Sequence, residues 1–525
     1  MKTFRFLLSL AVLFTALGCK TDAIDNFTIR LRPEIFDHTI MIEIYDANDP
    51  SKTLNNLLID VTSSNALDIY EISGTRNFTT VDGRIGIGLH RRANPTPDKS
   101  VLATLRISAD GYLTSNFNIL FKYDQNSAVV RIPMVNIGTP PPGVAFNTGG
   151  ATLQGGALGA PLRVMVPPGA NSNTGMEVEL PTGTQFFDAN GNALTGSNLD
   201  VQIGYFDPIN AESVESFPGD LSIDEVTLPG GNTGAGTFVT AGFTTINMEV
   251  DGVAVKTFST PITVTIDIDA NTINPNTQQP IQAGEIIPVW SYNEANDEWT
   301  YETDGNVIQG ASGLQLTYQS THLSWWNLDW FTNRCCSSDC ADLQISMPGW
   351  GPGEKKLVKL RVVNEGTNQP VSSWANTSVE IFDGYTTRFQ YASNSPVNIQ
   401  VLDYSTNQIL AQTGAVNLCS GTIPLTVTLP KPTFLTFKIT GVCANKPNIQ
   451  IRPSFWVYFR PAGSNLDYTT LGQVVNGQGS TSGLQINQTY DFRAYFNNTT
   501  IDTTVTINTN NYDIQLELGE YCDDL

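Results

Sequence analysis

Three consecutive residues, His322, Leu323 and Ser324, place an imidazole two positions before a hydroxyl nucleophile. Imidazole can take the proton of a serine hydroxyl, whose Oγ can then attack the preceding carbonyl carbon. Attack of Ser324 on the carbonyl of Leu323 would form an ester that water hydrolyses. The shift requires a turn that strains the peptide bond between them. The triplet therefore predicts self-cleavage between Leu323 and Ser324. The alternative is that 321–330 is a buried strand in which His322 and the neighbouring aromatic residues simply pack.

Other catalytic patterns are absent from the chain. It has three histidines, His38, His90 and His322, and no zinc-protease, nucleophile-elbow, P-loop or dinucleotide-binding motif. Carboxylates alone can hydrolyse a substrate, but only their separation in space could select a pair. The sequence therefore favours a protein that is not an enzyme, apart from the self-cleavage hypothesis, and predicts no cofactor.

Two short acidic stretches carry closely spaced oxygen ligands, the residues that Ca²⁺ prefers. They are 188–192 (Asp-Ala-Asn-Gly-Asn) and 267–271 (Asp-Ile-Asp-Ala-Asn). Each is equally typical of a turn or strand end rich in Asp and Asn. Neither has the bidentate Glu of an EF-hand loop, so we assign no metal site and keep Ca²⁺ only as an alternative.

The cysteines are typical of an exported chain with disulfides. After Cys19, six remain, all in the C-terminal part: Cys335, Cys336, Cys340, Cys419, Cys443 and Cys522. No histidine lies near them to support a zinc site. We expect Cys443 and Cys522 to close the last segment of the chain. One of the three clustered cysteines would pair with Cys419, and the other two would pair locally or stay reduced.

The N-terminus has the order of a secretory signal. Lys2 and Arg5 precede an apolar run, 6–17, which is shorter than the roughly 20 residues of a membrane span. Gly18 and Cys19 then follow. This end of the run resembles the lipobox of bacterial lipoproteins, in which the leader, here 1–18, is removed and the cysteine is lipidated. The residue after the cysteine is Lys20 and not Asp, so the usual inner-membrane retention signal is absent. The resemblance implies a lipid anchor at Cys19 in the outer membrane, exposed at the cell surface; the alternative is an ordinary signal peptide.

The charge of the chain excludes one class of partner. A net charge of −22 over 525 residues repels the phosphate backbone, so nucleic acid is not expected to bind. Charged residues make up only 15% of the chain, and Asn, Thr, Ser and Gly supply most of the polarity. This composition suits an extracytoplasmic β protein.

Apolar residues alternate with polar ones along most of the chain, which is typical of half-buried strands. Clear examples are 40–44, 262–268 and 514–518, and turns rich in Gly, Pro, Asn and Asp separate such segments. The sequence predicts an all-β protein of β-sandwiches in series, elongated and without a substantial helix after the leader.

Three breaks divide the chain into four blocks. A proline-rich linker lies at 139–143, a shift from aromatic to Cys/Ser-rich sequence at 333–339, and a Pro-Lys-Pro segment at 430–432. The expected blocks are a first block at 24–137, a second at 143–332, a third at 335–430 and a fourth at 431–525. The last two each have the length of one sandwich.

Two blocks resemble known modules. With Val-Asp-Gly-Arg at 81–84 and Ser-Ala-Asp-Gly-Tyr at 108–112, the first block resembles carboxypeptidase-regulatory-like or collagen-adhesin B-type sandwiches. The second block contains the segments 164–170, 288–292 and 321–327 and the residue Trp299. In these it resembles the β region of cartilage intermediate layer proteins and netrin-receptor or ankyrin-type modules. Some of those modules, and the proteolysis-site domain of adhesion receptors, cut themselves at a similar His-Leu-Ser/Thr triplet. The chain lacks the cysteines of the receptor version.

Aromatic residues outside the second block suggest a ligand class. Trp350, Trp374 and Trp456 could form a platform on which sugars stack, if the rings are exposed. Trp456 and Tyr458 share one face of a predicted strand whose other face is also apolar, and the sequence does not decide which face is covered. We expect a non-enzymatic surface lipoprotein for adhesion, glycan or matrix contact, or envelope scaffolding, with a glycan or protein ligand. The alternatives are the self-cleaving module and a glycan-binding accessory lipoprotein of an uptake system.

Overall fold

The structure is a computed structural model, and it describes most of the chain after the leader. The described residues are 29–31, 36–97, 99–169, 171–219, 221–294, 298–311, 313–336, 340–371, 377–390, 392–404, 406–430, 434–496 and 499–517. Within them, helical structure is limited to one four-residue α-helix, α2 (Ala211–Val214), and the 3₁₀ turns η2 (Ala66–Asp68) and η3 (Arg91–Ala93). The expectation of an all-β fold is confirmed.

The first block forms two sheets around one apolar core. Ile42 and Ile44 of the alternating segment 40–44 are fully buried in this core, between the two sheets. One sheet has the order β5-β6-β2-β9, with β3 beside β2, and the other has the order β4-β7-β8. The strands are β2 (Thr39–Asp46), β3 (Asp49–Thr53), β4 (Leu58–Val61), β5 (Ile69–Glu71), β6 (Arg84–Leu89), β7 (Val101–Ser108), β8 (Ser115–Phe121) and β9 (Ser127–Met134).

Most strands of the second block form one large sheet that surrounds its core, and β20 and β21 form a separate two-stranded sheet. The main path runs β11-β10-β15-β17-β25-β22-β23-β24-β19-β13-β12. Along β19, Ile262, Val264 and Ile266 are completely buried, while the residues between them reach the surface, as the alternation predicts. The strands are β10 (Val144–Gln154), β11 (Ala157–Leu158), β12 (Leu162–Val166), β13 (Met176–Leu180), β14 (Phe186–Phe187), β15 (Asn198–Phe206), β16 (Ser222–Thr227), β17 (Thr233–Val250), β18 (Val253–Ala254), β19 (Thr257–Ile268), β20 (Ile273–Asn274), β21 (Gln279–Pro280), β22 (Ile286–Asn293), β23 (Glu298–Gln309), β24 (Leu314–His322) and β25 (Trp325–Asn333).

The third and fourth blocks are smaller pairs of sheets. The third combines β29-β26-β32 with β31-β30-β27-β28, and the fourth combines β34-β33-β37 and β40 with β36-β35-β38-β39. The strands of the third are β26 (Asp342–Ser346), β27 (Lys356–Asn364), β28 (Thr377–Ile381), β29 (Thr386–Arg388), β30 (Val397–Asp403), β31 (Ile409–Gln412) and β32 (Thr422–Thr426). Those of the fourth are β33 (Leu435–Cys443), β34 (Lys446–Ile451), β35 (Phe455–Pro461), β36 (Thr469–Val474), β37 (Gln478–Thr481), β38 (Thr489–Phe496), β39 (Thr499–Thr506) and β40 (Asn511–Glu517).

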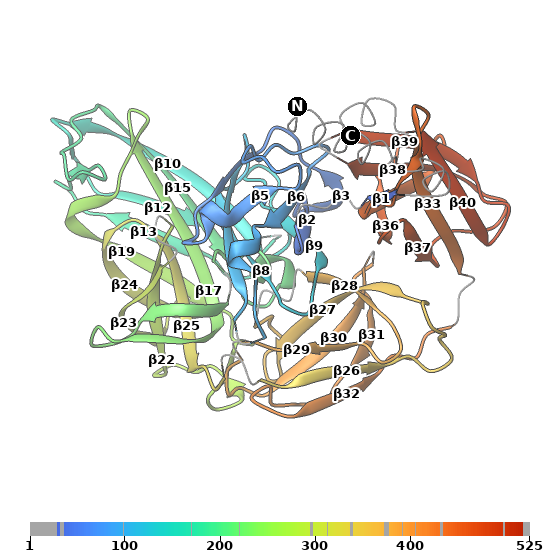
Figure 1. The fold of residues 1–525 in the computed structure, drawn as a ribbon. Coiled ribbons are helices and arrows are strands. Elements are labelled where there is room, and N and C mark those ends of the chain that lie inside the picture. Colours follow the sequence, from blue (N-terminus) through green and yellow to red (C-terminus); the bar gives the residue numbers. More distant parts are fainter. Residues whose placement is uncertain are drawn as a thin grey trace, which may run out of the picture.

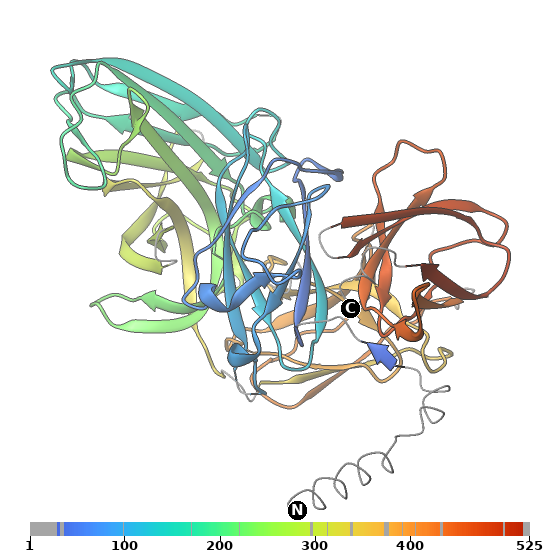
Figure 2. The same ribbon diagram turned by 45° about the horizontal axis from the view of Figure 1, so that its top comes forward.

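Two strand pairings cross the block boundaries. In the first, β28 of the third block pairs with β9 of the first, with Thr377 opposite Val130, so that one sheet continues through both blocks. In the second, β1 (Ile29–Leu31), the first described strand of the first block, runs parallel to β34 of the fourth. The beginning of the described chain is therefore held by its last block, where Figure 2 shows the short blue strand beside the red ones.

The blocks do not follow one another in an elongated row, as the sequence led us to expect. Figure 1 shows the first block at the centre, with the second, third and fourth around it. The physical reason is that the first block carries apolar and polar side chains on its outer face, and the other blocks bury them. Met41 and Val129 of the first block are buried against Trp456 and Tyr458 of the fourth. Burying such rings removes much apolar area from water, which favours docking over separation.

Candidate functional site: the self-cleavage triplet and the inter-block groove

The predicted self-cleavage triplet lies where β24 passes into β25. His322 ends β24, and Leu323 and Ser324 form the connection to β25. The Ser324 hydroxyl donates a 2.5 Å hydrogen bond to the carbonyl oxygen of Tyr292 and accepts a 2.9 Å bond from the Tyr292 N–H. The hydroxyl therefore closes the end of the neighbouring strand β22, and its proton is directed at a backbone carbonyl.

His322 contacts other groups. Its Nε2 lies 3.6 Å from Oε1 of Glu302, and its ring lies against Trp326 with centroids 5.0 Å apart. Within the described residues, His322 and Ser324 thus each have their own partners and share no hydrogen bond. The residues after the triplet form the buried strand β25, with Trp325 and Trp326 in the core. Self-cleavage stays a prediction, and it would require the Ser324 proton to leave Tyr292.

The acidic stretch 188–192 is a turn that satisfies its own oxygens. Asp188 Oδ1 accepts 2.8 Å bonds from the N–H groups of Asn190 and Asn192, and Oδ2 accepts from the Asn192 amide. The hydrogen bonds from Asn192 hold the pKa of the Asp188 carboxyl below its usual value. These hydrogen bonds form a turn of the kind that Asp and Asn favour.

The stretch 267–271 is similar. Asp267 accepts hydrogen bonds from the Gln315 amide and from the N–H of Gly175, and Asp269 accepts from the N–H of Asn271. In the part of the chain that the structure describes, no three His, Cys, Asp or Glu side chains gather in one place where they could hold a metal ion together.

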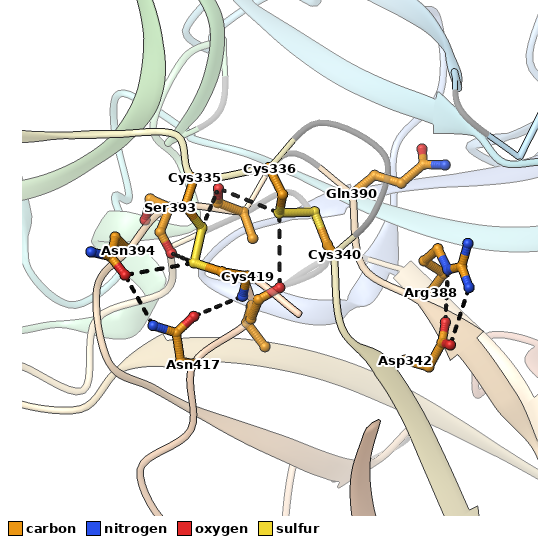
Figure 3. The surroundings of a disulfide bond; sticks show 12 residues. Cys335, Cys336, Cys340, Asp342, Arg388, Gln390, Ser393, Asn394, Asn417 and Cys419 are labelled. Carbon is orange, nitrogen blue, oxygen red and sulfur yellow. Dashed lines mark hydrogen bonds and ion pairs between the residues drawn. A yellow bond between two sulfur atoms is a disulfide. The ribbon is translucent and has the colours of Figure 1, made fainter. Parts of the chain in front are cut away.

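The clustered cysteines form two disulfides in the third block (Figure 3). Cys335 pairs with Cys419, with Cα atoms 5.7 Å apart, and Cys336 pairs with Cys340, with Cα atoms 5.6 Å apart. This is one of the arrangements that the sequence left open. Cys443 is also disulfide-bonded.

The remaining cysteine predictions fall outside the described residues. They concern Cys522, the expected partner of Cys443, and Cys19, the expected lipidation site. Among the residues that are described, no helix is both long and apolar enough to cross a membrane.

The tryptophans that suggested a sugar platform do not form one. Trp350 and Trp456 are 7% and 5% exposed, and Trp374 lies outside the described residues. The strand β35 has both faces covered: Phe455 and Phe459 pack on the core of the fourth block, while Trp456 and Tyr458 pack on the first block. The described tryptophan rings therefore give a glycan no surface on which to stack.

A buried carboxylate joins three blocks at the place where they meet. Glu43 on β2 is 5% exposed. Its Oε2 accepts a 2.7 Å hydrogen bond from the Tyr404 hydroxyl of the third block, and its Oε1 accepts one from the Thr470 hydroxyl of the fourth. The Nε atoms of Arg84 and Arg131 lie 3.6 and 3.5 Å from the same carboxylate. A buried charge is tolerated only with such partners, so this cluster fixes how the blocks sit.

Beside this cluster, a groove runs between the fourth block and the first and third blocks. It has two adjoining parts, with cavity volumes of about 630 Å³ and 740 Å³. We call it the inter-block groove. The residues that line both parts and connect them are Lys355, Glu380, Gln473, Val475 and Asn476.

The third and fourth blocks also touch directly across the inter-block groove. The Ser480 hydroxyl donates a 2.9 Å hydrogen bond to the carbonyl oxygen of Gly353. The N–H of Gln473 donates a 3.4 Å bond to Oε1 of Glu380. These bonds hold the two walls at a set distance.

The floor of the larger part is the outer face of a three-stranded sheet. In β37, β33 and β40, residues opposite one another point to the same face, and successive residues alternate. Phe437 and Tyr512 point to the core of the fourth block. The opposite face therefore presents two rows of polar side chains: Ser480, Thr436 and Asn511, and next to them Gln478, Lys438 and Asp513.

Aromatic rings contribute to the lining of the smaller part. Half-buried rings line it, namely Phe36, Tyr385 and Phe455, and Val475 is 42% exposed beside them.

The charges along both parts of the inter-block groove are paired. Three ion pairs have N···O distances of 3.3, 3.4 and 2.8 Å: Arg91–Asp37, Lys355–Glu380 and Lys438–Asp513. Asp124, which also lines the smaller part, accepts a 3.2 Å hydrogen bond from the Thr387 hydroxyl.

Sequence reasoning missed both the Glu43 cluster and the inter-block groove. One signal was available: strand β2 carries Glu43 between Ile42 and Ile44, and a carboxylate in an apolar strand needs a partner. The partners, Tyr404 and Thr470, lie 361 and 427 residues further on, and nothing local points to them.

Comparisons with known proteins add little. No protein-family model matches the chain, and no curated protein matches it significantly. Among solved structures, a streptococcal ancillary pilin is 11% identical, with a TM-score of 0.13, and the match covers 46% of this chain and 94% of the pilin. The shaft pilin of Lactobacillus rhamnosus is 8% identical, with a TM-score of 0.16, over 34% of this chain and 96% of that one. A putative cell adhesion protein from Bacteroides ovatus is 9% identical, with a TM-score of 0.14, over 34% and 93%. Scores this low carry no argument, and the family resemblances noted in the sequence stay predictions.

Proposed function

We propose that the chain is a non-enzymatic cell-surface lipoprotein, anchored through Cys19 in the outer membrane, that acts in adhesion or envelope scaffolding. The observation that carries the proposal is the Glu43 cluster. One buried carboxylate accepts hydrogen bonds from two other blocks, so the three blocks form a fixed frame around the inter-block groove. A surface that is already formed loses little conformational entropy when a partner binds, which suits a binding or scaffolding protein.

The position of β1 supports the same proposal. About ten residues separate Cys19 from Ile29, and an extended chain of that length spans at most roughly 35 Å. Because β1 pairs with β34, a lipidated Cys19 would keep the fourth block, and the groove beside it, close to the membrane.

The test is expression of the full chain with its own leader in a Gram-negative host. We expect labelled palmitate to enter the wild type and not Cys19→Ala. External protease should degrade the wild type on intact cells while a periplasmic marker survives. Cells carrying the wild type should attach better to polysaccharide- or matrix-coated surfaces than cells carrying Cys19→Ala. Equal labelling of both proteins, protection of the wild type from protease, or equal attachment would contradict the proposal.

A further inference from the structure

The inter-block groove has the size and place of a ligand site. Its two parts measure about 630 and 740 Å³. Small-molecule sites are typically clefts of roughly 300–1,000 Å³ and occur preferentially between domains. Its walls come from three blocks that the Glu43 cluster and the Ser480–Gly353 hydrogen bond hold together. The groove therefore exists before any ligand arrives.

The charges of the described lining residues are paired with one another, and the charge of the whole chain disfavours an anionic ligand. Each of the three cations among the lining residues has a carboxylate within 3.4 Å. A charged ligand would have to compete with these pairs, which are largely exposed and therefore oppose it only weakly. An anion would also be repelled by the net charge of −22.

The lining also selects against an extended peptide that adds a strand. Such peptides bind at a sheet edge, where backbone N–H and C=O groups are free. The floor here is a sheet face, and its central strand β33 is already paired with β37 on one side and β40 on the other. A peptide could therefore add a strand only at the outer edges of β37 and β40, and not across the floor.

The lining of the inter-block groove also contains uncharged polar groups beside apolar rings. On the floor, the Gln478 amide supplies both donors and acceptors, and the Asn511 amide supplies donors. The Ser480 and Thr436 hydroxyls donate to Gly353 and Asn511 and can still accept hydrogen bonds. Phe455, with Tyr385 and Val475, supplies apolar surface in the adjoining part. A chain of neutral sugars has hydroxyl groups at its edges and apolar C–H faces, so it matches both parts.

We propose that the inter-block groove binds an uncharged oligosaccharide. The proposal names the ligand class of the proposed surface function and rests on it for access to external glycans. Binding itself is a property of the folded chain, so it can be measured separately from anchoring.

The experiment uses the full chain, purified in a sugar-free zwitterionic detergent and titrated calorimetrically with cello-, malto-, laminari-, xylo- and mannohexaose. A hexamer of galacturonate serves as the charged probe. Val475→Trp fills the groove at an exposed position that lines both parts. Ile501→Trp is the matched control, since Ile501 is 39% exposed, belongs to the same block and lies on β39, whose residues do not line the groove. Gln478→Ala removes one amide from the floor without touching the core.

We expect at least one neutral hexasaccharide to bind the wild type and Ile501→Trp with equal affinity. Val475→Trp should bind it at least about tenfold more weakly, and Gln478→Ala about fivefold more weakly, the loss of one hydrogen bond of about 1 kcal/mol. The proposal is overturned if no neutral hexasaccharide binds, if galacturonate binds more tightly, or if the two Trp variants bind alike. A chain that binds sugar but fails to reach the cell surface would refute the proposed function alone.

Discussion

Arg84 on β6 donates a 2.6 Å hydrogen bond from Nη2 to the carbonyl oxygen of Tyr468, 384 residues further along the chain. The same guanidinium lies over the Tyr458 ring, 4.5 Å from its centroid, and pairs with the buried carboxylate of Glu43. One side chain of the first block thus contacts the backbone and an aromatic ring of the fourth. The docking of the last block on the first depends on this buried cation.

Replacing Arg84 with Met should destabilise the protein strongly. Glu43 would keep Arg131 but lose its other cation, and a buried charge deprived of a partner costs about 3–5 kcal/mol. The measurement is the urea midpoint followed by tryptophan fluorescence. Hydrogen exchange in β35 and β36 should also become faster, because these strands would lose their cover.

Arg163→Met is the control for this change. Arg163 is 64% exposed and pairs with Glu177 and Glu179 at the surface of the second block. Exposed pairs contribute little to stability, so the urea midpoint should hardly move. Equal losses in the two variants would show that Arg84 acts like any surface cation and that the Glu43 cluster does not fix the blocks.

Replacing Asp329 with Asn should stabilise the protein at neutral pH. Asp329 lies on β25 with no exposed surface, and burial raises the pKa of its carboxyl well above the usual 3.8. The folded state therefore keeps the proton that the unfolded chain releases above its lower pKa. The stability that comes from this group is complete below the unfolded pKa and is lost as the pH rises towards the folded one.

The asparagine variant has almost the same shape and no proton to lose. Its advantage over the wild type should be absent near pH 3.5 and should grow by about 1.4 kcal/mol per pH unit until the folded pKa is reached. Urea unfolding at pH 4, 5.5 and 7 measures the difference. A difference that is the same at all three pH values would mean that Asp329 is ionised in the folded protein.

The sequence predicted local structure well because alternation is a local property. Ile262, Val264 and Ile266 on β19 show it: a side chain on every second residue must face the core, whatever the partner strands are. The arrangement of blocks could not be predicted in this way. Trp456 and Tyr458 form an apolar face of β35 that does not belong to the core of the fourth block. The sequence pattern of β35 is the same whether this face contacts solvent, a ligand or the first block.

The same distinction between local and long-range information applies to the candidate site. The disulfides of the third block involve cysteines that the sequence analysis named. They could be named because the chain has few cysteines, so the possible partners are few. The inter-block groove was not predicted, because its lining comes from Phe36 to Asp513 and no segment of it forms a motif. Polar residues such as Gln478 and Asn511 become a surface only through the register of β33 with its neighbours.

Ser324→Ala separates the two interpretations of the triplet. If the chain cleaves itself, denaturing gels and intact-mass analysis should show two fragments that meet between Leu323 and Ser324 in the wild type and one intact chain in the variant. If both proteins are intact, the triplet has only a structural role. If both proteins are intact, the structure also gives an expectation for stability.

The Ser324 hydroxyl makes two hydrogen bonds to the backbone of Tyr292. Their loss should cost about 1–3 kcal/mol, at 0.5–1.5 kcal/mol for each bond. Ser324→Thr keeps a hydroxyl and serves as the control. A variant Ser324→Ala as stable as the wild type would mean that these two bonds do not form in solution.

The two disulfides of the third block should differ in what they contribute. Cys335–Cys419 closes a loop with a sequence separation of 84, and Cys336–Cys340 one with a separation of 4. The chain-entropy relation assigns about 4.6 kcal/mol to the first and about 1.9 kcal/mol to the second, because the longer loop restricts the unfolded chain more. The paired variants Cys335→Ala/Cys419→Ala and Cys336→Ala/Cys340→Ala test this by urea unfolding. Cys340 is 5% exposed in the core of the third block, so its alanine variant adds a packing loss, which Cys340→Ser and Cys340→Val would bracket. Equal losses after this correction would show that the stabilisation comes from native contacts near the sulfur atoms and not from loop length.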